Sequence, residues 1–158
     1  MQFRPDGCKE TDGYLNSLND SKKVYYIDET FGNVNKFQTK DNTILWNPNL
    51  AKLTNENVIL SPATLLNHEL DHANQFDSKK DKFINDVTTK DKKYDNLEEK
   101  RVIEGSEQDT ARKHGEITGM EVTRKDHNMK SYISVIDPTS TGGIIVTAQK
   151  KKEDQKNP

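Results

Sequence analysis

The sequence predicts an α+β fold, with short strands before and after two helices. The first observation is a helical apolar period that starts after Ser61 and persists to about Phe76. The second is a helical stretch over residues 97–114. The third is a set of short β-branched and aromatic runs outside these helices, which are typical of strands.

Five segments carry the strand pattern. They are residues 23–27 (KVYYI), 31–39, 42–46 (NTILW, stopped by Asn47 and Pro48), 132–136 and 143–147 (GIIVT). Residues 54–61 are expected to connect the third strand to the first helix. Residues 1–22 are expected to form loop, with a short helix around residues 15–18.

The helix signals are specific. Ser61 and Pro62 are typical of the N-cap and first position of a helix. Its apolar face is carried by Ala63, Leu66, Leu70 and Ala73. The highly charged residues 77–95 are interpreted as a solvated excursion. The second helix is expected to start at Asn96, break at Gly105 with Ser106 as a new cap, and end at Gly115.

Composition limits the classes of function. The 158 residues predict one domain over residues 1–149, with a charged, disordered tail at 150–158. The formal net charge of −2 gives no basic footprint for nucleic acid, and no apolar run is long enough to span a membrane. Cys8, the only cysteine, is expected to be a free thiol. The N-terminus has no stretch of the signal-peptide type.

Residues 68–72 read His-Glu-Leu-Asp-His, which matches the pattern H-E-x-x-H. Residues four apart on a helix share a face, so His68 and His72 can bind one zinc ion. Glu69 is rotated away from the ligands and can act as the general base that takes a proton from a metal-activated water. The alternatives are a chance match, on the order of one percent, and a surface helix with two solvated histidines.

A catalytic zinc needs a third protein ligand, and no third histidine follows the motif at a usual spacing. The second helix offers Glu98, Glu99, Glu104 and Glu107. We favour Glu99 because it shares a face with Val102 and Ile103 and should point inward. Glu98 is the nearest rival, and Glu107 follows if the helix restarts at Ser106.

Four further residues are candidates for supporting roles. Asp71 could support a ligand from behind but is expected to face solvent. His114 is interpreted as a surface residue near a helix end. His127 and Tyr132 could each stabilise the oxyanion of a substrate, although an ordinary structural role is expected of each alone.

The segment LLNHELDHA (residues 65–73) resembles the active-site helix of zincin metallopeptidases. The segment NLEEKR (96–101) resembles the glutamate-bearing helix of the gluzincin type. That resemblance implies Glu99 as third ligand, with Val102 where alanine is usual. It implies a twisted antiparallel sheet packed on the motif helix and on the second, glutamate-bearing helix. It also implies an edge strand at residues 42–46 that binds extended substrate.

The combination with EEKRVIEGSE and the later segment Pro138 to Ser140 is similar to effector metallopeptidase domains at the C-termini of bacterial RHS and other polymorphic toxins. The resemblance implies a monomeric zinc endopeptidase that is secreted or delivered into a target cell as part of a larger protein. It implies a protein or peptide substrate and a cognate immunity protein. The alternatives are a non-catalytic zinc-binding or metal-free interaction domain, and a zinc hydrolase of another class, such as an amidase.

Overall fold

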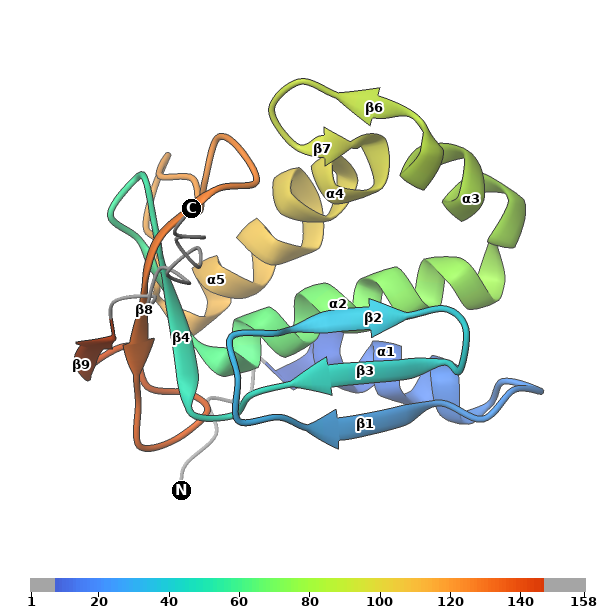
Figure 1. Ribbon diagram of the computed structural model, residues 1–158, viewed down its shortest axis with the longest axis horizontal. Helices are drawn as coiled ribbons and strands as arrows, with labels where there is room; N and C mark the ends of the chain where they lie inside the picture. Colours follow the sequence, from blue (N-terminus) through green and yellow to red (C-terminus); the bar gives the residue numbers. More distant parts are fainter. Residues whose placement is uncertain (1–7, 147–158) are drawn as a thin grey trace, which may run out of the picture.

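The computed structural model describes residues 8–146, and it shows the α+β fold that the sequence predicts (Figure 1). Its helices are α1 (Cys8–Asn19), α2 (Pro62–Ser78), α3 (Lys80–Thr88), α4 (Leu97–Val102), a π-helical turn (Ile103–Glu107) and α5 (Gln108–His114). Its strands are β1 (Tyr26–Glu29), β2 (Lys36–Gln38), β3 (Thr43–Trp46), β4 (Leu50–Thr54), β5 (Ile59–Leu60), β6 (Lys90–Asp91), β7 (Asp95–Asn96), β8 (Met129–Ser134) and β9 (Ile144–Val146).

The first sheet has the order β1-β3-β2 and corrects two expectations. β1 and β3 are parallel, so this sheet is not purely antiparallel. β3 lies in the centre, so residues 42–46 do not form the edge strand that the resemblance implied. The reason is that Ile44 is fully buried, paired with Ile27 on one side and Phe37 on the other. The edge that faces the motif helix is β2.

The second sheet has the order β5-β4-β8-β9, with all neighbours antiparallel. β4 was not predicted, because its sequence LAKLT contains a lysine and few β-branched residues. β5 lies inside the expected connection 54–61. The side chains of Ala51 and Leu53 pack with Ile133 and Val135 on one face of this sheet. The other face of β4 therefore carries Lys52.

Helix α2 is the centre of the fold and confirms the predicted helix. The backbone N–H of Thr64 donates to Ser61 Oγ over 3.3 Å, and Pro62 occupies the first turn. In Figure 1, α2 runs beside β2, with α1 behind it and α4 and α5 on the opposite side. Because neighbours surround α2, its polar motif residues are buried together with Leu70 and Ala73.

An aromatic cluster holds β2 against α2. The ring centroids of Phe37 and Phe76 are 5.6 Å apart, and those of Phe76 and Phe83 are 5.3 Å apart. The cluster also contains Leu70 and Leu18, so it joins β2, α2, α3 and α1. Burial of these rings fixes the separation between the edge strand and the motif helix.

Residues 77–95 are mostly exposed, as expected of a solvated segment, but they form regular structure that was not expected. This segment forms α3, β6 and β7, because Phe83, Asp86 and Tyr94 are buried among its many charges. The apolar residues of this segment are few among its many charges, so its short amphipathic pattern is weak in the sequence. Helix α1 is likewise longer than the short helix expected around residues 15–18.

The second helix begins and ends at the residues that the sequence predicts. Asn96 Oδ1 accepts a hydrogen bond from Glu99 N over 2.9 Å, and Gly115 ends α5 with φ of 75°. The expected interruption at Gly105 is confirmed, because two helical segments meet there across a kink. The expected new cap at Ser106 is wrong, because Ser106 Oγ donates to Asp71 and no side chain caps the start of α5. Gly105 has non-helical dihedrals within that turn (φ −110°, ψ −106°).

None of the helices within residues 8–146 combines the length and the apolar character needed to cross a bilayer. The predicted tail at 150–158 lies outside the described residues, as does the side chain of Cys8.

Candidate metal centre

Three side chains from α2 and α4 converge on one point. His68 Nε2 and His72 Nε2 lie 3.0 Å apart. Glu99 Oε2 lies 3.2 Å from His68 Nε2, and Glu99 Oε1 lies 3.4 Å from His72 Nε2. This buried group of two histidines and one glutamate could hold a metal ion. The structure thus brings together the three residues that the sequence singled out as ligands.

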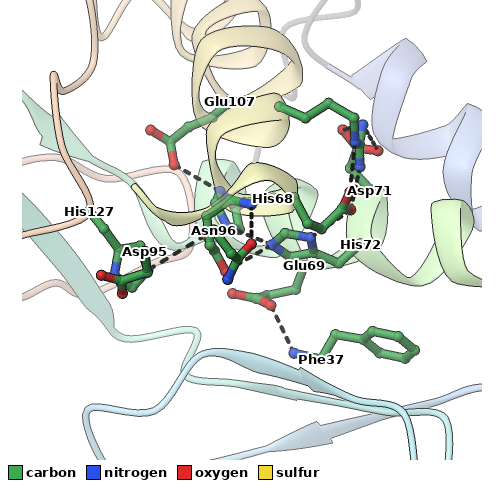
Figure 2. Close-up of polar contacts among 12 residues, drawn as sticks. Phe37, His68, Glu69, Asp71, His72, Asp95, Asn96, Glu107 and His127 are labelled. Carbon is green, nitrogen blue, oxygen red and sulfur yellow. Dashed lines mark hydrogen bonds and ion pairs between the residues drawn. The ribbon is translucent and has the colours of Figure 1, made fainter. Parts of the chain in front are cut away.

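Each imidazole is held from behind by a second carboxylate. His68 Nδ1 lies 2.9 Å from Glu107 Oε2, and His72 Nδ1 lies 3.1 Å from Glu98 Oε1. An ionised carboxylate only accepts hydrogen bonds, so each Nδ1 must carry the hydrogen. Both Nε2 atoms then turn their lone pairs towards Glu99 when the rings are neutral, which is the orientation that metal ligation requires. Figure 2 shows the contact between His68 and Glu107.

The π-helical turn places Glu107 in this arrangement. Eight residues separate Glu99 from Glu107, which in a regular α-helix is about 2.2 turns and leaves the two side chains on different faces. Gly105 lies between them with non-helical dihedrals, so the helix is kinked there and the regular spacing does not apply. Glu99 and Glu107 both contact His68 of α2, as expected for Glu107 when the helical period is interrupted at Gly105.

The donor set fits a metal ion. Glu99 Oε2 is buried and has no hydrogen-bond partner among the described residues, although it lies beside two histidines. With ligand bonds of about 2.0–2.1 Å, a tetrahedral zinc would hold neighbouring donor atoms about 3.3 Å apart. The separations of 3.0, 3.2 and 3.4 Å are close to that value. A bound cation would satisfy the Glu99 oxygen that the protein leaves without a partner.

Without a metal, the same site binds protons strongly. Burial alone would lower the pKa of His72, but hydrogen bonds to Glu98 and Glu99 outweigh it and raise the pKa to about 10. The pKa of His68 is also raised, because Glu107 and Glu99 overcome its burial. Burial opposes the ionisation of Glu107, yet Arg124 and His68 lower its pKa to about 2. The carboxylates are therefore ionised and ready to neutralise a cation.

Glu69 lies beside the ligands without touching them. Its Oε2 accepts a hydrogen bond from the backbone N–H of Phe37 over 2.8 Å, which ties the carboxylate to the edge strand β2 (Figure 2). Its Oε1 makes no hydrogen bond to the residues that the structure describes. Glu69 is thus oriented through one oxygen and keeps the other available within the cavity.

Asp71 is buried, so the expectation that it faces solvent is wrong. Both of its oxygens bind the Arg101 guanidinium, at 2.9 and 3.1 Å, and Ser106 donates to it as well. Arg101 also binds both oxygens of Glu98, at 2.7 and 3.1 Å. Asp71 is buried because its side of α2 packs against α4 and the π-helical turn rather than facing water. Asp71 thereby supports His72 through Arg101 and Glu98.

Two residues that sequence reasoning missed hold Glu107. Arg124 binds both of its oxygens, one of them from Nε at 2.9 Å, and Thr123 Oγ1 donates to it over 2.8 Å. Both residues come from the loop before β8, and both are buried. A single arginine in a polar loop gives no sequence signal, because its partner is set by the tertiary fold.

The site opens into a cavity of about 1220 Å³. One wall is the edge strand β2 with its flanking residues 33–40, and the floor is α2 with His68, Glu69 and His72. Towards α3 the lining is apolar: Phe76, Phe83, Ile84 and Val87. Towards β4 it is polar and basic: Lys52, Arg124 and His127. The cavity is therefore an elongated groove that passes across the candidate ligands.

The remaining candidates are placed as follows. His127 lines the groove, with Nε2 3.5 Å from Glu99 Oε2 and Nδ1 2.7 Å from Asp95 Oδ2. Tyr132 pairs with Lys52 across β8 and β4 but does not line the groove. Glu104 is exposed.

His114 is half-buried rather than a free surface residue. Its Nδ1 lies 2.8 Å from Thr64 Oγ1, so it contacts the first turn of α2. The end of α5 packs there against the start of α2, which explains the burial.

No protein-family model matches the chain, and no curated protein and no solved structure matches it either.

Proposed function

We propose that this protein is a zinc-dependent endopeptidase of the HExxH type. The observation that carries the proposal is the unpartnered, buried Glu99 oxygen facing two imidazoles whose Nδ1 atoms are both held by carboxylates. His68, His72 and Glu99 are the proposed ligands, and three protein ligands leave a fourth position open, as catalytic zinc sites require. A zinc ion there would lower the pKa of a water molecule and polarise a carbonyl group.

Glu69 is the proposed general base. Phe37 N–H holds one carboxylate oxygen, and the other can take a proton from the attacking water. Glu69 then gives that proton to the amine that leaves when the peptide bond breaks. Its tether to β2 also fixes the base relative to the strand along which a peptide would lie.

The proposed substrate is an extended peptide. The groove runs along β2, and the Phe37 N–H that binds Glu69 points away from β3, so this edge of the sheet faces the groove. An exposed sheet edge can hold a peptide in extended form by main-chain hydrogen bonds.

The proposal includes the biological setting that the resemblance to gluzincin-type effector domains of polymorphic toxins implies. In that setting the domain is delivered into a target cell as part of a larger protein and acts there on a host or competitor protein. A cognate immunity protein would cover the groove. Support for this part comes from the segments around His68 and Glu99.

The test is cleavage of an unfolded protein, such as reduced casein, by zinc-loaded wild type and by Glu69→Gln, with fragments identified by mass spectrometry. Wild type should generate defined fragments, and Glu69→Gln should bind zinc equally but cleave at least about 100-fold more slowly. Glu104→Gln, which changes an exposed carboxylate, is the matched control and should cleave normally. Equal cleavage by Glu69→Gln would refute the assigned role. Zinc binding without any cleavage by wild type would favour a non-catalytic zinc domain.

A further inference from the structure

Lys52 enters the groove from the second sheet, opposite the base. It is the middle residue of β4, and its side chain lines the same groove as His68, Glu69 and Arg124. Its strand neighbours Ala51 and Leu53 point to the other face of the sheet and pack with Ile133. The fold therefore presents the ammonium of Lys52 to the groove.

The Lys52 ammonium has no hydrogen bond and no ion pair with any residue between 8 and 146. The neighbouring nitrogen donors of the groove are engaged, because Arg124 binds Glu107 and His127 contacts Asp95. An ammonium group has three donors, and none of the three has a partner among the described residues. An unpaired, half-buried ammonium that lines a groove is suited to bind an anionic oxygen of a ligand.

The charges around Lys52 place it near the reacting groups. Burial lowers the pKa of Lys52, and among the carboxylates that oppose this effect Glu69 acts most strongly, ahead of Glu107 and Glu99. Lys52 also lines the same groove as Glu69 and Glu99, so a ligand oxygen that it binds lies in the groove that holds the base. A recognition site for a distant carboxylate of the substrate would lie farther along the groove.

We propose that Lys52 binds the carbonyl oxygen of the scissile peptide bond and stabilises the negative charge that develops on it. This inference rests on the proposed peptidase function. The water oxygen forms a bond to the carbonyl carbon, the carbonyl electron pair moves onto the oxygen, and Glu69 takes the proton of the water. Lys52 donates a hydrogen bond and keeps its proton. When the C=O bond re-forms, the C–N bond breaks and the leaving amine takes the proton from Glu69.

This assignment replaces the two residues that sequence reasoning offered for the oxyanion. Tyr132 does not line the groove, although it shares a sheet face with Lys52. His127 is 41% exposed and its Nδ1 is engaged by Asp95. Lys52 lines the groove and has donors that no described residue engages, and such donors can stabilise an oxyanion.

The first arm of the test compares Lys52→Met with Lys130→Met, the same change at an exposed position on the neighbouring strand β8. Lys52→Met should lower kcat about 100- to 1000-fold, with KM and zinc content almost unchanged. It should melt close to the wild-type temperature, because Lys52 has no protein partner to lose among the described residues. Lys130→Met should retain wild-type kcat. Lys52→Gln serves as a second variant if Lys52→Met does not fold.

The second arm uses inorganic phosphate, a tetrahedral oxyanion, as a probe for the zinc-loaded proteins by calorimetry. Phosphate should bind at least about tenfold more weakly to Lys52→Met than to wild type or Lys130→Met, since a charge-assisted hydrogen bond is lost. This arm tests Lys52 even if wild type cleaves no peptide, so failure of the peptidase proposal is distinguishable. Unchanged kcat together with unchanged phosphate affinity would overturn the proposal. A raised KM at unchanged kcat would also overturn it, and would assign Lys52 to a carboxylate of the substrate.

Discussion

His68 on α2 contacts Glu107, the last residue of the π-helical turn. Nδ1 of the imidazole lies 2.9 Å from Oε2 of this fully buried carboxylate. His72 and Glu98 form the equivalent pair at 3.1 Å. Glu98 and Glu107 were the two rivals of Glu99 for the role of third ligand. Their contacts on Nδ1 explain how all three glutamates can belong to one site while only Glu99 faces the Nε2 atoms.

Glu98→Gln should weaken zinc binding about 10- to 100-fold without abolishing it, because it removes the charge that orients His72. Arg101 would remain paired with Asp71, so the fold should persist. Zinc affinity can be measured by competition with a chromophoric chelator. Glu104→Gln is the control and should bind zinc as wild type does. Complete loss of zinc in Glu98→Gln, with full retention in Glu99→Gln, would make Glu98 the ligand instead.

The metal-free protein should be most stable between about pH 4.5 and 6.5. The pKa of His72 is raised from 6.5 to about 10, so its contribution is complete below pH 6.5 and is lost as the pH rises to 10. The pKa of Glu107 is lowered from 4.5 to about 2, so its contribution is present above pH 4.5 and is lost as the pH falls to 2. Thermal unfolding in chelator across this range measures the effect. A Tm that rises between pH 6.5 and 10 would contradict the prediction.

Zinc binding at pH 7 should release protons, because the raised pKa values of His72 and His68 mean that the metal-free site holds protons there. Apparent zinc affinity should therefore increase as the pH rises from 6 to 8. Calorimetry in buffers of different ionisation enthalpy counts the released protons. Binding that releases none and has the same affinity at both pH values would show that the histidines are not the ligands.

Asp71→Asn should destabilise the metal-free protein by about 3 kcal/mol, the lower part of the range for breaking a buried ion pair, since Arg101 keeps Glu98 as a partner. Chemical denaturation measures the change in the free energy of unfolding. Asp109→Asn, at an exposed position on α5, is the matched control and should change stability by less than about 0.5 kcal/mol. Equal stability of the two variants would mean that the Asp71–Arg101 pair contributes little.

Sequence reasoning located the two motif helices because their signals are local. The cap at Ser61 and the spacing of His68 and His72 depend only on residues within a few turns. Glu99 could be favoured over its neighbours because its inward face is set by the helical period. The same reasoning had no access to the partner of Asp71, which lies 30 residues away on another helix.

Other features could not be read from the sequence because they also depend on tertiary contacts. The place of β3 in the middle of its sheet depends on pairing with β1 and β2, which no local pattern encodes. Glu107 reaches His68 beyond the kink at Gly105; the glycine signals an interruption, but the direction of the chain after it depends on the tertiary fold. Lys52 gave no signal, because a lysine in a strand is ordinarily assigned to the solvent-facing side.

The most direct test of the account is metal content, measured by mass spectrometry on wild type, His72→Ala, Glu99→Ala and the control Glu104→Ala after exposure to zinc. The account predicts one zinc per chain in wild type and in Glu104→Ala. It predicts that His72→Ala and Glu99→Ala both lose the metal. Wild type that binds no zinc, or Glu99→Ala that binds it fully, would contradict the proposed centre.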